Sequence, residues 1–157
     1  MGYSEFEVLT HTDFCDYMEA FNIDLDRAFE CVILIGLAYL FSLPIGWDRE
    51  KQVRSAGLRT FPLVAVSSCA FMVIASGFND MQVVSRAFQG VVTGLGFVGG
   101  GAILKKDDKV EGMSTAVSIW LTGAIGVSCG IKRFEIAFIL MLVCLLSLKY
   151  GKGEKNK

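Results

Sequence analysis

The stretch AFQGVVTGLGFVGGGAIL, residues 87–104, contains no Asp, Glu, Lys or Arg and has six glycines within twelve residues. Four other blocks are equally free of charge: residues 31–47, 61–78, 112–131 and 136–148. A surface helix needs a polar face, whereas these blocks are apolar on all sides. Their natural solvent is therefore lipid, and each approaches the ~20 residues that cross a bilayer as a helix.

The overall composition hides this distribution of charge. The 157 residues are 53% hydrophobic and carry a net charge of −1, whereas an ordinary globular domain has roughly 45–50% apolar residues. A chain of this length can form about five helical spans with short loops and has no room for a second folded domain. The pattern excludes a soluble catalytic domain, and the absence of a basic surface excludes a nucleic-acid-binding protein.

We therefore predict an all-α fold, a polytopic membrane helical bundle of about five transmembrane helices preceded by an amphipathic N-terminal segment. The first and last spans are short for a hydrocarbon core of about 30 Å unless flanking residues snorkel. The glycine-rich third span is expected at the centre of the bundle, against the first and fourth, and the fifth at the perimeter, facing lipid. The predicted spans are Phe29–Trp47, Phe61–Phe78, Ala87–Leu104, Met113–Ile131 and Phe134–Tyr150.

Three regions follow from these spans: an acidic N-terminal segment (1–28), a transmembrane domain (29–150) and a basic cytoplasmic tail (151–157). In the first, apolar residues recur at i, i+4, i+7 and i+11, the spacing of one stripe on a helix. This helix either lies on the bilayer surface or docks on a partner. The acidic start is the reverse of a cleavable signal peptide, so the first span is expected to be an uncleaved anchor. The stripe consists of Phe14, Met18, Phe21 and Leu25.

The Lys and Arg residues between the spans predict the orientation, because positively charged short loops stay in the cytoplasm. With five spans, one side receives eleven basic residues and the other receives four. The N-terminus is therefore expected outside and the C-terminus in the cytoplasm. The richer side has Arg49, Lys51, Arg54, Arg59, Lys105, Lys106, Lys109, Lys149, Lys152, Lys155 and Lys157, and the other has Arg27, Arg86, Lys132 and Arg133.

The cysteines and the single histidine indicate neither a disulfide framework nor a zinc site. The five cysteines are odd in number, and four of them lie in or beside apolar blocks, where they act as small hydrophobic residues. Zinc normally takes three or four protein ligands, whereas His11 has only Cys15 at a ligand spacing. We expect no cofactor.

The third span has the densest signal, because Gly costs a helix roughly 1 kcal/mol relative to Ala. Two small-xxx-small pairs provide a face on which another helix can pack closely, which is the simpler interpretation. The alternative is that the run Gly99–Gly101 breaks the helix at depth and exposes backbone groups to an ion or solute. The two pairs are Gly90 with Gly94 and Gly96 with Gly100.

The fourth span has a matching stripe of small and hydroxylated residues at an unbroken spacing of four. Hydroxyls in a membrane usually donate to their own i−4 carbonyl or to a neighbouring helix, which is the simpler interpretation. The alternative is a polar groove between the third and fourth spans, to which Gln89 and Thr93 also contribute. Thr115 lies beside the stripe, and Trp120 lies on the opposite, apolar face. The stripe consists of Ser114, Ser118, Thr122, Gly126 and Gly130.

Charged residues gather where the first span ends. Asp48, Arg49 and Glu50, with Arg59 before the second span, can form an ion-pair cluster that pins the short loop. The alternative is a binding or gating site that faces the cytoplasm, in which the carboxylates of Asp48 and Glu50 hold Mg²⁺ through water. The segment 105–109 on the same side alternates in charge and is expected to be a solvated turn.

At these residues the sequence resembles the MgtC/SapB family of bacterial inner-membrane proteins. Four linked motifs carry the resemblance in the family's order, over about residues 25–150. They are IGWDRE (45–50), AGLRT (56–60), TGLGFVGGGAIL (93–104) and VEGMSTA (110–116), the last followed by Ile119 and Trp120. The sequence ends where longer members continue into a soluble regulatory domain, so it resembles a short form.

Several positions depart from the family's usual residues. Trp47 and Asp48 stand where Leu and Glu are usual, Ser42 where Gly is common, and Ser114 where Thr is usual. Gln89 lies one place before the family's Gln, which rotates its side chain by about 100° around the helix. The candidate functional residues are Asp48, Arg49, Glu50, Gly57, Arg59, Thr60, Arg86, Gln89, Thr93, Gly94, Gly96, Gly99, Gly100, Gly101, Gly112, Ser114, Thr115, Ser118 and Trp120.

The resemblance implies a multi-pass protein of the bacterial inner membrane that is associated with adaptation to low Mg²⁺. Our first hypothesis is a non-enzymatic factor in magnesium or ion homeostasis that acts by contact with another membrane protein or as a homo-oligomer. The runner-up is a small ion or solute channel or carrier that uses the groove between the third and fourth spans. Pumps and transporters usually keep an ionisable group deep in a span, and the charge-free blocks have none. An enzyme is not expected, because no span holds a His or a Ser beside a credible base.

Overall fold

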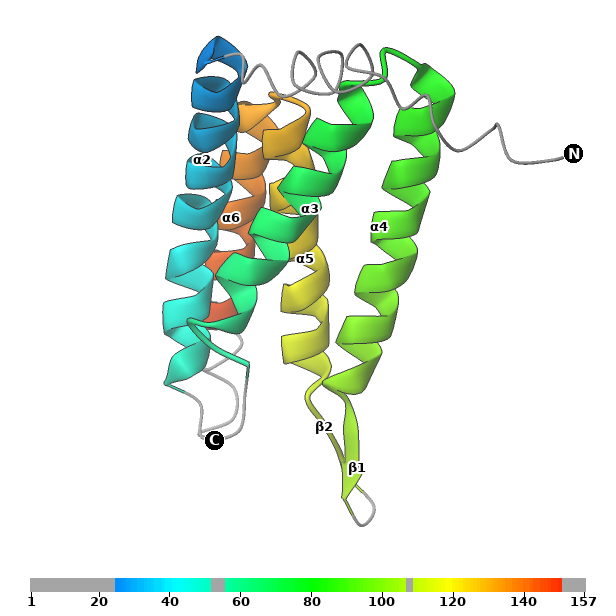
Figure 1. The fold of residues 1–157 in the computed structure, drawn as a ribbon. Helices are drawn as coiled ribbons and strands as arrows, with labels where there is room; N and C mark the ends of the chain where they lie inside the picture. Colours follow the sequence, from blue (N-terminus) through cyan, green and yellow to red (C-terminus); the bar gives the residue numbers. More distant parts are fainter. Residues whose placement is uncertain (1–24, 52–55, 107–108, 151–157) are drawn as a thin grey trace, which may run out of the picture. The chain divides into compact units, whose positions relative to one another are not determined.

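The computed structural model describes residues 25–51, 56–106 and 109–150. Within them lie five helices: α2 (Leu25–Glu50), α3 (Thr60–Ser76), α4 (Met81–Gly101), α5 (Met113–Gly130) and α6 (Phe134–Tyr150) (Figure 1). A short antiparallel hairpin, β1 (Leu104–Lys106) with β2 (Lys109–Glu111), connects α4 to α5. Most of the predicted N-terminal segment and the whole basic tail lie outside the described residues.

The chain forms two compact units, residues 1–32 and 33–157, and α2 begins in the first and ends in the second. Of the first unit the structure describes only residues 25–32, which form the start of α2 and are exposed or half-buried. The bundle described below is the second unit.

The five charge-free blocks predict the five helices correctly, and the prediction of an all-α fold is confirmed for the described residues apart from the hairpin. The expectation of a short first span is wrong. α2 has 26 residues and continues through Pro44, so at 1.5 Å per residue it is about 39 Å long. By length and composition α2 and α5 are apolar enough to cross a membrane, and α3 is a shorter apolar helix.

The centre of the bundle is α5, not the glycine-rich α4. α5 contacts α3, α4 and α6, and twelve of its 18 residues are buried. The main contacts of α4 are with α3 and α5, and only Val91, Leu95 and Gly99 of α4 are buried. The prediction that α4 lies at the centre is therefore wrong, whereas its predicted contact with the fourth span, α5, is confirmed. α6 lies at the perimeter, as expected, with only Ala137 and Cys144 buried.

Glycines on α5 allow its backbone to approach α3 closely. A methyl group added at Gly126 would overlap the carbonyl oxygen of Ala65. One added at Gly130 would lie 2.8 Å from the carbonyl oxygen of Cys69, which is closer than a side-chain carbon approaches in ordinary packing. Small residues bring helices together in this way where lipid supplies no hydrophobic driving force between them. The C-terminal part of the α5 stripe, Gly126 and Gly130, thus packs against α3.

The hydroxyl groups of this stripe donate to carbonyls of their own helix, as the simpler interpretation predicts. Ser118 Oγ donates to the carbonyl of Ser114 at 2.7 Å, and Thr122 Oγ1 donates to that of Ser118 at 2.8 Å. Both side chains are buried. Their polar atoms are therefore satisfied within α5 and leave its surface smooth for packing.

The ends of α4 differ from the predictions. Asp80 precedes the helix and its carboxylate accepts a hydrogen bond from the Gln82 amide at 2.8 Å, a normal N-terminal cap. At the other end the helix is continuous to Gly101, so the glycine run ends the helix and does not break it at depth. The segment predicted as a solvated turn belongs to the hairpin, in which Leu104 pairs with Glu111 and Lys105 with Val110, and residues 107–108 lie outside the described residues.

We expect Gly126→Ala to destabilise the bundle, because the added methyl group meets the backbone of α3, which cannot rotate away as a side chain can. Overpacking of this kind costs about 1–3 kcal/mol. The measurement is unfolding of the purified protein in mixed micelles by increasing SDS, followed by circular dichroism.

Gly36→Ala is the matched control, since nothing lies within 4 Å of a methyl group at Gly36. Alanine there is expected to stabilise α2 by about 0.5–1 kcal/mol. Equal unfolding midpoints for the two variants would contradict the packing of α5 on α3.

Candidate functional site

The charged end of α2 is partly buried beside α6 and the segment that precedes α3. Arg49, which the sequence places in an ion-pair cluster, is only 3% exposed. The Arg49 guanidinium interacts electrostatically with Asp48 and with the Cys144 thiol of α6. The same thiol forms a hydrogen bond with Ser118 of α5. Burial of a guanidinium is costly unless charged and polar groups surround it. The structure thus joins Asp48, Arg49 and Ser118, and adds Cys144, which no sequence signal indicated.

Glu50 binds the segment that precedes α3. Its Oε2 accepts a hydrogen bond from the Leu58 amide at 2.9 Å, and a methyl group added at Gly57 would overlap the Glu50 carboxylate. Gly46, one turn before Glu50, also lets this segment pack closely on α2, because a methyl group added at Gly46 would lie 3.2 Å from the Leu58 Cα. Glu50 therefore pins the loop through a backbone amide, not through the predicted pair with Arg59, which is exposed.

Two neighbours of this loop complete its geometry. The carbonyl of Gly57 accepts hydrogen bonds from the amides of Thr60 at 2.9 Å and Phe61 at 3.2 Å, so Gly57 starts α3. Lys51 Nζ lies 5.9 Å from the centre of the Trp47 ring, a cation–π contact at the end of α2. Hydrogen bonds at Gly57 and the cation–π contact of Lys51 therefore lie at the two ends of the loop.

The predicted magnesium ligands do not converge. Asp48 and Glu50 are two residues apart on a helix and therefore point to different sides. Asp48 is half-buried, whereas Glu50 is exposed and its Oε2 is held by Leu58. Within residues 25–51, 56–106 and 109–150, no three His, Cys, Asp or Glu side chains gather as metal ligands do.

α4 presents most of its candidate residues to the outside of the bundle. Arg86, Gln89, Thr93, Gly94 and Gly96 are exposed. A methyl group added at any of Gly90, Gly94, Gly96, Gly100 and Gly101 would have nothing within 4 Å. The small-xxx-small pairs are therefore not used by another described helix of this chain. Only Gly99 is in close contact, because its added methyl group would lie 3.2 Å from the carbonyl oxygen of Ala116.

The start of α5 depends on Gly112, which has φ +91°. An L-residue is strained there, and a methyl group at this position would also overlap the carbonyl oxygen of Ala102. The Gly112 carbonyl accepts from the Ala116 amide at 2.9 Å and opens the helix. Beyond it Thr115 is buried, while Ser114 and Trp120 are exposed.

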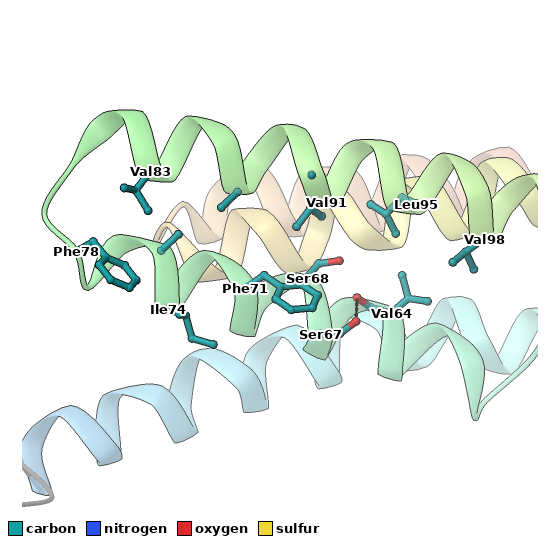
Figure 2. A pocket seen from close by; sticks show the side chains of 14 residues that line it. Val64, Ser67, Ser68, Phe71, Ile74, Phe78, Val83, Val91, Leu95 and Val98 are labelled. Carbon is teal, nitrogen blue, oxygen red and sulfur yellow. Dashed lines mark hydrogen bonds between the residues drawn. The ribbon is translucent and has the colours of Figure 1, made fainter. Parts of the chain in front are cut away.

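The predicted polar groove between the third and fourth spans is not formed by the described residues. α4 and α5 are in direct contact where Gly99 meets Ala116, and a methyl group at Gly123 would overlap the Leu95 side chain. An apolar groove of about 590 Å³ lies instead between α3 and α4. Figure 2 shows Phe71 and Ile74 of α3 beside it, with Ser67 donating to the Val64 carbonyl. A groove with this lining is not a path for ions.

Comparison with known proteins identifies relatives over most of the chain. The family described as the MgtC family matches residues 35–155. Protein SrpB of Synechococcus elongatus is 36% identical over 126 residues, which are 71% of this chain and 69% of that protein. The Escherichia coli K12 protein named "Putative magnesium transporter YhiD" is 35% identical over 128 residues, 76% of this chain and 60% of that protein.

A third relative is Protein MgtC of Brucella abortus, which is 40% identical over 93 residues, 59% of this chain and 39% of that protein. The chain thus spans from 39% to 69% of the length of these three relatives. No solved structure matches the chain. The motifs quoted above, the family match and the identity to SrpB and YhiD agree, and this chain belongs to the MgtC family.

Proposed function

We propose that this protein is a five-span protein of the bacterial inner membrane, with its N-terminus outside, and a non-enzymatic factor in magnesium or ion homeostasis. It acts by helix-to-helix contact with other membrane proteins, its own copies included. The observation that carries the proposal is the outer face of α4, which holds polar and glycine residues that no described helix of this chain covers.

Exposed apolar side chains support the membrane location. On α3, Leu63 is 65% and Ile74 61% exposed, and on α6 Ile139 is 56% exposed. Apolar surface on this scale is a liability in water and is ordinary in lipid. α3 and α6 have 17 residues each, or about 26 Å, and span a core of about 30 Å with modest local thinning.

The arrangement of the loops supports the orientation. The end of α2, the start of α3, the hairpin and the end of α6 lie at one end of the bundle (Figure 1). That end holds Arg49, Lys51, Arg59, Lys105 and Lys149 among the described residues. Positively charged short segments remain in the cytoplasm, which puts this end inside and the α3–α4 and α5–α6 turns outside.

The proposed link to magnesium comes from the MgtC family and from the name of its relative, the putative magnesium transporter YhiD. We do not assign a Mg²⁺ site to Asp48 and Glu50, because their carboxylates diverge and Glu50 is held by the Leu58 amide. A contact role also fits α4 better than a transport path does, since the groove beside it is apolar.

Cysteines introduced one at a time at the two ends of the bundle test the orientation. We expect Lys132→Cys, in the α5–α6 turn, to react with a membrane-impermeant maleimide in intact cells. Lys105→Cys, in the hairpin, is expected to react only after the membrane is permeabilised. The unsubstituted protein supplies the background from its own cysteines. Equal labelling of both positions in intact cells would overturn the five-span arrangement.

Growth under magnesium limitation tests the role. We expect a strain that lacks the gene to grow poorly in micromolar Mg²⁺ and normally in millimolar Mg²⁺, and the intact gene to restore growth. Gly36→Ala is expected to restore growth, and Gly126→Leu, which disrupts the bundle, is not. A strain without the gene that grows like its parent in both media would contradict the role in magnesium homeostasis.

Thermal unfolding tests for a metal site at the inner end. A ligand that binds only the folded state raises the unfolding temperature with concentration. We expect Mg²⁺, added at constant ionic strength, to raise the unfolding temperatures of the wild type, Asp48→Asn and Glu50→Gln by the same amount, because Asp48 and Glu50 do not form a metal site. A larger shift in the wild type than in both variants would show that these carboxylates bind the ion.

A further inference from the structure

A pocket of about 420 Å³ lies between the last turns of α2 and α6. Each helix lines it with residues spaced at i, i+3, i+4 and i+7, which lie on one side of a helix. The i+7 residue is a lysine in both sets. We call this space the inner pocket, and it is lined by Pro44, Trp47, Asp48, Lys51, Leu142, Leu145, Leu146 and Lys149.

The inner pocket is apolar at one end and basic at the other. Pro44 and Leu142 each lie seven residues before the lysine of their own set, which is about 10 Å along a helix axis. α2 and α6 run in the same direction (Figure 1), so Lys51 and Lys149 lie at the same end of the bundle. The apolar part of the lining therefore points toward the middle of the spans, and the lysines form its mouth.

Aromatic side chains at the mouth indicate the level of the lipid headgroups. Trp47 is 64% and Tyr150 80% exposed, and Trp and Tyr concentrate where headgroups meet hydrocarbon. Lys51 Nζ lies 5.9 Å from the centre of the Trp47 ring, so this ammonium group lies beside the pocket wall. The mouth of the inner pocket thus lies where lipid phosphates are found.

The charge at the mouth favours an anion. Asp48 also lines the pocket, but it interacts electrostatically with the buried Arg49, which offsets its charge. Lys51 and Lys149 are exposed, and neither forms an ion pair with another described residue. Basic pockets between spans on the cytoplasmic side are typical sites for anionic lipid headgroups.

The shape and lining select a phospholipid over other ligands. A free phosphate would satisfy the lysines and leave the apolar wall of Leu142, Leu145 and Leu146 uncovered. The larger groove between α3 and α4 could hold an acyl chain, but none of the described residues that line it is charged. The inner pocket alone among these two spaces matches both the phosphate and the acyl chain of one lipid.

We propose that the inner pocket binds one anionic phospholipid of the cytoplasmic leaflet. Its phosphate lies between Lys51 and Lys149, and one acyl chain lies along Leu142 and Leu146. The inference rests on the proposed function, because this end of the bundle must face the cytoplasmic leaflet. It goes further by giving the protein a lipid ligand, which joins the end of α2 to α6.

Native mass spectrometry of the full chain tests the lysines, with phosphatidylglycerol and phosphatidylcholine of identical acyl chains added to the micelles. We expect the wild type to retain one phosphatidylglycerol in preference to phosphatidylcholine. A lysine near an anionic headgroup contributes about fivefold to binding. The double variant Lys51→Gln, Lys149→Gln is therefore expected to bind phosphatidylglycerol about ten- to thirtyfold more weakly.

Lys105→Gln is the matched control, because it removes the same charge from the hairpin at the same end of the bundle and lies outside the pocket lining. It is expected to bind phosphatidylglycerol as the wild type does. Equal binding by the double variant and the wild type, or equal retention of the two lipids by the wild type, would overturn the proposal.

A second pair of variants tests the acyl chain. We expect Leu142→Trp, which fills the inner pocket, to lose the bound phosphatidylglycerol. Val143→Trp, at the neighbouring exposed position outside the lining, is expected to keep it. Glycerol 3-phosphate is expected not to compete with the lipid. Competition by glycerol 3-phosphate, or full binding by Leu142→Trp, would indicate a site for a free anion and overturn the proposal.

Two further readouts separate the possible failures. Unfolding by SDS shows whether each tryptophan variant is folded, and the lysine variants change only exposed side chains, so they test the site even if Leu142→Trp does not fold. Loss of lipid selectivity while the cysteine topology and growth at low Mg²⁺ hold would overturn the lipid site and leave the proposed function standing.

Discussion

Gly126 and Gly130 bring the backbone of α5 close to the backbone of α3 at Ala65 and Cys69. Helices in lipid gain little from burying apolar side chains, so close packing and satisfied polar groups hold them together. The hydroxyls of Ser118 and Thr122 help by donating within their own helix. α5 can therefore be buried on nearly all sides and still carry hydroxyl groups.

The position of α4 follows from this packing. α3 occupies the part of the α5 stripe at Gly126 and Gly130, and α4 contacts α5 along the line of Leu95 and Gly99. Gly90 and Gly94 line the groove towards α3, whereas methyl groups added at Gly96, Gly100 and Gly101 would have nothing within 4 Å. The same distribution of small residues thus builds the core on α5 and leaves part of the α4 surface uncovered, which is the basis of the contact role proposed above.

The helices could be predicted from the sequence because the exclusion of charge from a lipid-length block is a local property. Their arrangement could not. The glycines of α4 and those of α5 look alike in sequence, and only the three-dimensional packing shows that Gly126 meets a backbone while Gly96 meets nothing. The burial of Arg49 beside Cys144 also depends on two residues far apart in the chain. The motifs at residues 45–50 and 56–60 correctly pointed to one place, where Glu50 binds the Leu58 amide.

The distance between α3 and α5 in a lipid bilayer tests the packing of the bundle most directly, because the positions of the other helices depend on that contact. Solid-state NMR of protein with labelled glycine and alanine can detect transfer between the Gly126 Cα and the Ala65 carbonyl carbon at short mixing times. A strong cross-peak between these two carbons is expected. Cross-peaks from Gly126 to α4 or to lipid chains, with none to Ala65, would contradict it.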